Sequence, residues 1–176
     1  MIWKYTLPTH DKIKSKLLDI IENYEPVKEY PDTISKTDFY DSGKREYWNI
    51  LNEGLEPLWK EISNKYWVKE WYSKLWFQQY CNNDFHGWHL HSEASVSMSY
   101  LLELPDPRYS TEFVDNKNNK RFQLNVCEGD VIIFPSYTIH RAPIIKSDIR
   151  KTTIAINLNF GEPNLNKVNL IDPILN

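Results

Sequence analysis

The chain has 176 residues, a length that one domain with a full hydrophobic core accounts for. Its formal net charge of −3 gives no support to binding of a nucleic-acid backbone. Two cysteines, Cys81 and Cys127, are too few for a disulfide scaffold and form no C-x-x-C pair, which favours a reduced, cytoplasmic protein. No apolar run reaches the roughly 20 residues of a membrane span, and the first residues lack the apolar core of a signal peptide, so we expect no membrane association.

The first 68 residues predict a helical front. One alternating segment predicts an edge strand, and two segments with apolar spacings near three and four predict amphipathic helices joined by a polar connection. In chain order these are residues 2–7 (strand), 11–24 (helix), 25–43 (connection) and 45–66 (helix). Gly54 and Pro57 lie inside the second helical segment and predict a kink or a split there.

From residue 71 onward the sequence predicts short strands. Segments dense in β-branched and aromatic residues follow one another between turn residues: 71–80, 88–91, 96–102, 111–114, 121–126, 131–134, 137–142 and 152–160. Residues 115–120 predict a hairpin tip. Because no crossover helices separate the strands, we expect a mainly β sandwich or barrel with the N-terminal helices packed on one face, in a single domain over residues 1–176.

Histidines concentrate in the predicted strands. Residues i and i+2 of a strand point to the same side, so His89 and His91 can converge on one ion. Residues 129–136 predict a turn, a buried strand and a second turn that brings His140 to the opposite wall. A histidine pair at strand spacing with a distant third predicts a metal site. Imidazole suits Fe, Zn, Cu and Ni, so these ligands alone do not select the metal.

The order and spacing of four motifs resemble the Fe(II)/2-oxoglutarate oxygenases, in particular the prolyl-hydroxylase-like group of phages and bacteria. The matching residues are YCNNDFHGWHLH at 80–91, SMSYL at 97–101, FPSYTIH at 134–140 and Arg150. The resemblance covers roughly residues 75–160. It implies a double-stranded β-helix, the jelly-roll or cupin-like barrel, over about residues 70–160.

The resemblance also implies an activity and its cofactors. A member of this family holds Fe(II), uses 2-oxoglutarate and O₂ as co-substrates, and hydroxylates a C–H bond with release of succinate and CO₂. Arg150 would pair with the far carboxylate of 2-oxoglutarate, and hydroxyls of Tyr80, Ser99 and Thr152 would lie near the same carboxylate. No catalytic residue is expected beyond the metal ligands.

The expected metal ligands depart from the family pattern at one position. Where the family usually has a carboxylate, this chain has His91, which gives a site of His89, His91 and His140. The alternative register replaces His89 with Glu93 and restores two imidazoles and one carboxylate. The short turn after the motif favours the first, and the charge of the metal favours the second. His91 is a ligand in both.

A second hypothesis is a cupin, because the same strings resemble the cupin pattern of His89-x-His91, Gly129, Pro135 and His140. Such a protein would bind a metal, or act as a dioxygenase, without 2-oxoglutarate, and it leaves Arg150 without a role. The expected substrate is a small molecule or a protein side chain. Exposed edge strands permit a homodimer without requiring one. The expected location is the cytoplasm, that of the host if the chain is phage-encoded.

Overall fold

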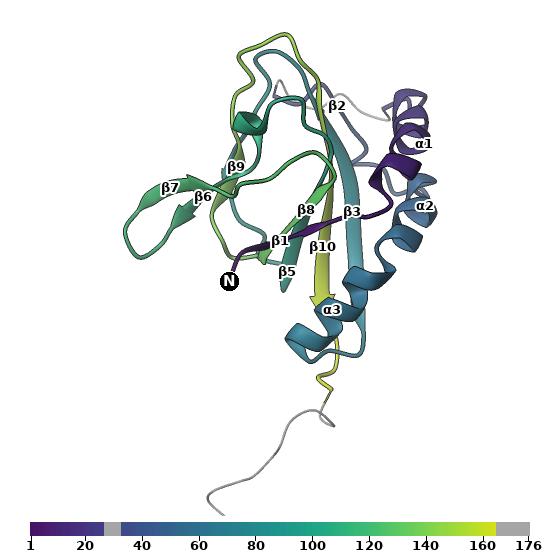
Figure 1. The fold of residues 1–176 in the computed structure, drawn as a ribbon, viewed down its shortest axis with the longest axis vertical. Coiled ribbons are helices and arrows are strands. Elements are labelled where there is room, and N and C mark those ends of the chain that lie inside the picture. Colours follow the sequence, from purple (N-terminus) through teal and green to yellow (C-terminus); the bar gives the residue numbers. More distant parts are fainter. Residues whose placement is uncertain (27–32, 165–176) are drawn as a thin grey trace, which may run out of the picture.

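The computed structural model describes residues 1–26 and 33–164 (Figure 1). Its helices are α1 (His10–Glu22), α2 (Tyr47–Gly54), α3 (Glu56–Tyr66) and a short 3-10 helix (Pro107–Tyr109). Its strands are β1 (Trp3–Thr6), β2 (Lys36–Thr37), β3 (Trp71–Tyr80), β4 (His86–His89), β5 (Val96–Glu103), β6 (Glu112–Asp115), β7 (Lys120–Gln123), β8 (Asp130–Pro135), β9 (His140–Ala142) and β10 (Lys151–Phe160). None of these helices is long and apolar enough to cross a membrane.

Two antiparallel sheets form the body of the protein. The six-stranded sheet has the order β1-β8-β5-β10-β3-β2, and the four-stranded sheet has the order β4-β9-β6-β7. Strands β3 to β10 pass between the two sheets in the alternating manner of a double-stranded β-helix, and each predicted strand overlaps one of them. The predicted edge strand is β1, which pairs with β8. The mainly β jelly-roll fold is therefore confirmed.

The three helices lie along the outer face of the larger sheet, as Figure 1 shows. One apolar cluster joins helix residues such as Leu17 and Leu51 to strand residues such as Phe77 and Ile154, all of them fully buried. A second cluster, which includes Phe113 and Phe134, fills the space between the two sheets. The helices pack on one face of the larger sheet, as the sequence predicted. The opposite face of that sheet lines the barrel.

The second helical segment is split, as its Gly and Pro predicted. Gly54 ends α2, where a Cβ would stand 2.7 Å from Thr9 Oγ1, so the residue permits the close approach of α1 to α2. Pro57 lies in the first turn of α3, where the amide proton that proline lacks has no helical partner in any case. The connection predicted at residues 25–43 contains β2, which was not predicted, and its residues 27–32 lie outside the described part of the chain.

Strand alternation in β3 and β10 determines which of their side chains line the barrel interior. Ile154, Ile156 and Leu158 of β10 pack under the helices, so the residues between them face the barrel. The register sets the inward residues of the two strands opposite one another: Lys151 with Tyr80, Thr153 with Gln78, Ala155 with Trp76, and Asn157 with Lys74. A row of polar and aromatic side chains therefore runs along the inside of the larger sheet.

Candidate metal centre

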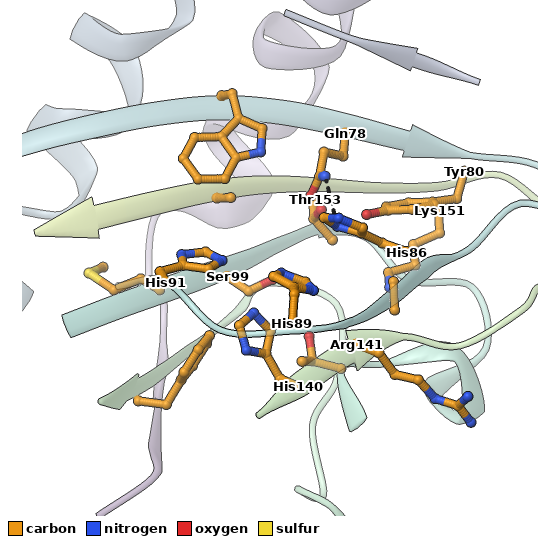
Figure 2. A pocket seen from close by; sticks show the side chains of 16 residues that line it. Gln78, Tyr80, His86, His89, His91, Ser99, His140, Arg141, Lys151 and Thr153 are labelled. Carbon is orange, nitrogen blue, oxygen red and sulfur yellow. Dashed lines mark hydrogen bonds between the residues drawn. The ribbon is translucent and has the colours of Figure 1, made fainter. Parts of the chain in front are cut away.

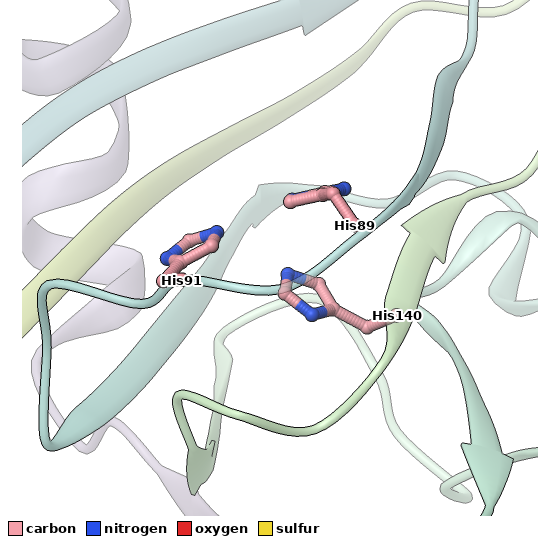
Figure 3. Close-up of side chains that lie close together, drawn as sticks. All are labelled: His89, His91 and His140. Atoms are coloured by element: carbon pink, nitrogen blue, oxygen red, sulfur yellow. The ribbon is translucent and has the colours of Figure 1, made fainter.

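Three histidines from the smaller sheet and the turn beside it form one cluster. His89 ends β4 and stands opposite His140, the first residue of β9. His91 follows β4, and its backbone N–H donates to Ser136 O over 2.8 Å. One ring nitrogen of each histidine lies within 4.8 Å of the others, and Figure 3 shows the three rings facing one another. The structure thus brings together the three histidines that the first register named.

The alternative register is not assembled in the structure. Glu93 lies exposed in the turn that leads from β4 to β5 and is not part of the cluster. Of the two ligand sets left open by the sequence, the set of three imidazoles is the one whose nitrogens converge.

Each imidazole of the cluster is held by a hydrogen bond at Nδ1. The acceptors are Gly87 O for His89 (2.7 Å), Asn157 Oδ1 for His91 (2.7 Å) and Thr138 O for His140 (2.8 Å). A carbonyl oxygen only accepts, so each Nδ1 carries the proton and each Nε2 retains a free lone pair. This arrangement of the second ring nitrogen is typical of metal-ligating histidines, where it fixes the tautomer and the ring orientation.

The environment keeps these rings uncharged. Burial, followed by the charge of His89, lowers the pKa of His140 to about 3. Burial also lowers the pKa values of His89 and His91 below the ordinary value near 6.5. A neutral imidazole is the form that binds a metal. Three neutral nitrogen donors with fixed tautomers therefore fit a divalent transition-metal ion.

The stability of the metal-free protein is expected to depend on pH because of these shifts. The folded pKa values lie below the unfolded value near 6.5, so the unfolded chain takes up protons first as the pH falls. The contribution of these histidines to the free energy of unfolding should be constant above about pH 7 and should fall from pH 7 to 5, by at most about 1.4 kcal/mol per pH unit for each histidine. Urea titrations at pH 7, 6 and 5 measure this, and the slope should be smaller in His140→Asn. A free energy that stays level in this range would contradict the assignment.

Asn157 of β10 is expected to act as a positioning residue for His91. Its Oδ1 accepts from His91 Nδ1 and from Ser97 Oγ, at 2.7 and 2.8 Å. Replacing Asn157 with Leu should weaken Zn(II) binding by about 10- to 100-fold, the usual effect of losing such a partner. Asn157→Asp supplies another acceptor and should restore the affinity, and calorimetric titration measures both. Equal losses in the two variants would indicate a merely structural role.

A small, partly open cavity of about 50 Å³, the inner cavity, adjoins the cluster inside the barrel. Figure 2 shows the side chains that line it, among them Tyr80, Ser99, Thr153 and Lys151. Lys151 is only 2% exposed, and its ammonium lies 5.0 Å from the centroid of the Tyr80 ring. Burial lowers the pKa of Lys151 to about 7. No acidic residue lines this cavity, and Lys151 forms no ion pair with any acid in residues 1–26 or 33–164.

Two of the four residues expected to bind 2-oxoglutarate lie elsewhere. Arg150 contacts Glu103 with two nitrogens, at 2.8 and 2.9 Å, and Glu22 of α1 at 3.0 Å. Thr152 also donates to Glu103, and neither residue lines the cavity. Tyr80 and Ser99 do line it. The sequence reasoning missed Lys151, which follows Arg150 directly and therefore points to the other side of β10.

Comparisons with known proteins establish the fold. No family model and no curated protein matches the chain. Solved structures do match, among them the viral collagen prolyl hydroxylase of Paramecium bursaria Chlorella virus-1 in complex with 2-oxoglutarate (TM-score 0.64, 11% identity, 92% of this chain and 96% of that chain). A second is the prolyl hydroxylase of Trichoplax adhaerens in complex with a hypoxia inducible factor peptide fragment (TM-score 0.65, 10% identity, 95% and 87%). A third is HygX of Streptomyces hygroscopicus with nickel and 2-oxoglutarate bound (TM-score 0.61, 10% identity, 90% and 82%). The fold of this chain is thus that of the 2-oxoglutarate–Fe(II) oxygenases.

Proposed function

We propose that this protein is an Fe(II)- and 2-oxoglutarate-dependent dioxygenase that hydroxylates a C–H bond of a small molecule or a protein side chain. The observation that carries the proposal is the buried ammonium of Lys151, which lies in an acid-free cavity beside three imidazoles with free Nε2 atoms. A buried cation is costly unless an anion compensates it. The oxygenase fold of the chain agrees with this reading.

His89, His91 and His140 would hold the metal through Nε2. The bound Fe(II), with 2-oxoglutarate and O₂, would supply the oxidising chemistry and release succinate and CO₂. The protein would offer the metal three oriented neutral nitrogen donors, and it would leave the remaining coordination positions open to the inner cavity. The hydrogen bonds to Gly87, Thr138 and Asn157 keep the rings in place without a change of tautomer.

Lys151 takes the role that the resemblance gave to Arg150. Its ammonium would pair with the far carboxylate of 2-oxoglutarate, while the Tyr80 and Ser99 hydroxyls lie in the same wall. Arg150 is already engaged by Glu22 and Glu103 on the outer side of β10. The cupin alternative, which uses no 2-oxoglutarate, leaves the buried charge of Lys151 without a partner.

Isotopic conversion of 2-oxoglutarate tests the proposal. Purified protein is incubated with Fe(II), O₂ and ¹³C-labelled 2-oxoglutarate, and labelled succinate is measured by mass spectrometry. Succinate should form slowly even without a substrate, and its formation should require both Fe(II) and O₂. The His140→Ala protein gives the background rate. Succinate at or below that background, in protein shown to bind Fe(II), would contradict the proposal.

A further inference from the structure

A second, open cavity of about 340 Å³ also borders the histidine cluster. Its lining overlaps that of the inner cavity at Trp76, Gln78, His86, His89 and His91, and its own wall includes Lys74 and Glu93. The volume suits a small molecule. Because His89 and His91 line both cavities, a molecule in the open cavity would reach the metal site from a cavity that Lys151 does not line.

Trp76, which lines both cavities, carries an unused hydrogen-bond donor. The residue is 6% exposed, and its indole Nε1–H is buried without a partner. Its ring packs edge-on against Phe39, with centroids 5.1 Å apart, and lies 6.0 Å from the His91 ring. Buried donors are nearly always hydrogen-bonded in folded proteins, and one without a partner at a cavity wall indicates an acceptor supplied by a ligand.

Lys74 adds a positive charge two residues away on the same face of β3. The strand register sets it opposite Asn157, the residue that holds His91. Its ammonium lies 4.7 Å from the centroid of the Phe39 ring and forms no ion pair with an acid of the described ranges. An N–H donor and an ammonium in one wall together favour a carboxylate.

The net charge around the metal site also favours a bound anion. A divalent ion held by three neutral imidazoles would carry two positive charges, Lys151 in its ammonium form would add a third, and 2-oxoglutarate would bring two negative ones. The usual ligand carboxylate would supply the remaining negative charge, but His91 stands in its place. A site with one excess positive charge in a partly buried cavity favours a further anion.

We propose that the open cavity binds a small carboxylic acid as the substrate, with its carboxylate held by the indole N–H of Trp76 and the ammonium of Lys74. This rests on the proposed function, because the substrate is the molecule that the metal site oxidises. Glu93 and Lys74 are both exposed residues of the cavity wall, so water weakens the charge of each, and Glu93 favours a cationic group on the outer end of the substrate, as in an α-amino acid.

Acetate is the minimal probe of this subsite, and acetamide is its neutral counterpart. Zn(II)-loaded protein with ¹⁵N-labelled tryptophan is titrated with each compound, with and without 2-oxoglutarate, and the indole N–H resonances are followed by NMR. The Trp76→Phe variant identifies the Trp76 resonance by its loss. Lys74→Met removes the charge, and Lys69→Met is the matched control, because Lys69 is an exposed lysine that lines neither cavity.

Acetate should shift the Trp76 resonance saturably, acetamide should not, and the acetate Kd should rise about 5- to 10-fold in Lys74→Met and stay unchanged in Lys69→Met. Three results would overturn the proposal: no shift, an equal shift with acetamide, or equal affinity in the two lysine variants. A shift that disappears when 2-oxoglutarate is added would also overturn it, because Trp76 would then belong to the co-substrate site. Failure of 2-oxoglutarate itself to bind, seen from its own ¹³C signals, would reject the proposed function separately.

Discussion

Replacing His140 with alanine is expected to weaken Fe(II) binding by at least about 100-fold. His140 is the buried member of the cluster, one of its ring nitrogens is among the three that lie within 4.8 Å of one another, and its Nδ1 is hydrogen-bonded to Thr138 O. Loss of an outer hydrogen-bond partner alone usually costs 10- to 100-fold in metal affinity, so loss of a ligand should cost at least the upper end of that range. Anaerobic equilibrium dialysis of both proteins against Fe(II) measures the ratio.

His86 provides the matched control for this variant. Its ring stacks on His89 with centroids 4.1 Å apart, and it lines the same cavity, yet it is not part of the converging group. His86→Gln should therefore retain Fe(II) affinity within a few-fold. If it lost as much affinity as His140→Ala, the ligand set would have to be reassigned to include His86.

Replacing Lys151 with methionine is expected to raise the Kd for 2-oxoglutarate by about 10- to 100-fold. A hydrogen bond to a charged group contributes about 1.5–3 kcal/mol. In the inner cavity no other cation is placed to replace Lys151, since Arg141 is paired with Glu112. Methionine keeps the length and the apolar stem of the side chain, so the cavity should keep its shape. Calorimetric titration of 2-oxoglutarate into Ni(II)-loaded protein gives both constants.

Arg150→Met is the control, because this residue precedes Lys151 and carries the same charge on the opposite side of β10. Its 2-oxoglutarate affinity should stay within about twofold of the parent protein. A large loss in Arg150→Met with little change in Lys151→Met would return the anchor to Arg150, as the resemblance implied.

Arg150 also shows how far the sequence determines the site. Strand alternation placed Arg150 and Thr152 on one face of the strand, and the structure agrees, since both contact Glu103. The prediction placed that face inside the barrel, whereas it lies on the side of the sheet that the helices cover. Ile154, Ile156 and Leu158 share the parity of Arg150 and pack under the helices, so this face points away from the barrel. The alternation of apolar residues in this strand already indicated which face the helices cover, and it places Lys151 on the interior face.

The histidine cluster was more predictable because His89 and His91 stand two residues apart and the third histidine follows a recognisable turn. The i, i+2 spacing of His89 and His91 and the turn before His140 were enough to indicate convergence, and the short turn that contains Glu93 favoured the register that the structure assembles. The number of strands and the absence of crossover helices predicted a sandwich or barrel, and the resemblance to the oxygenases implied the jelly roll. The Nδ1 partner of His91 was beyond the sequence, because Asn157 reaches His91 across 66 positions of the chain.

Titration of anaerobic, Fe(II)-loaded protein with 2-oxoglutarate, followed by visible absorption, reports whether the metal site binds the co-substrate. We expect the weak band of the iron–2-oxoglutarate chelate to appear and saturate in the parent protein and in Arg150→Met, and to be lost or greatly weakened in Lys151→Met. Iron binding without such a band in the parent protein would contradict the 2-oxoglutarate assignment and favour a cupin-type metal site in its place.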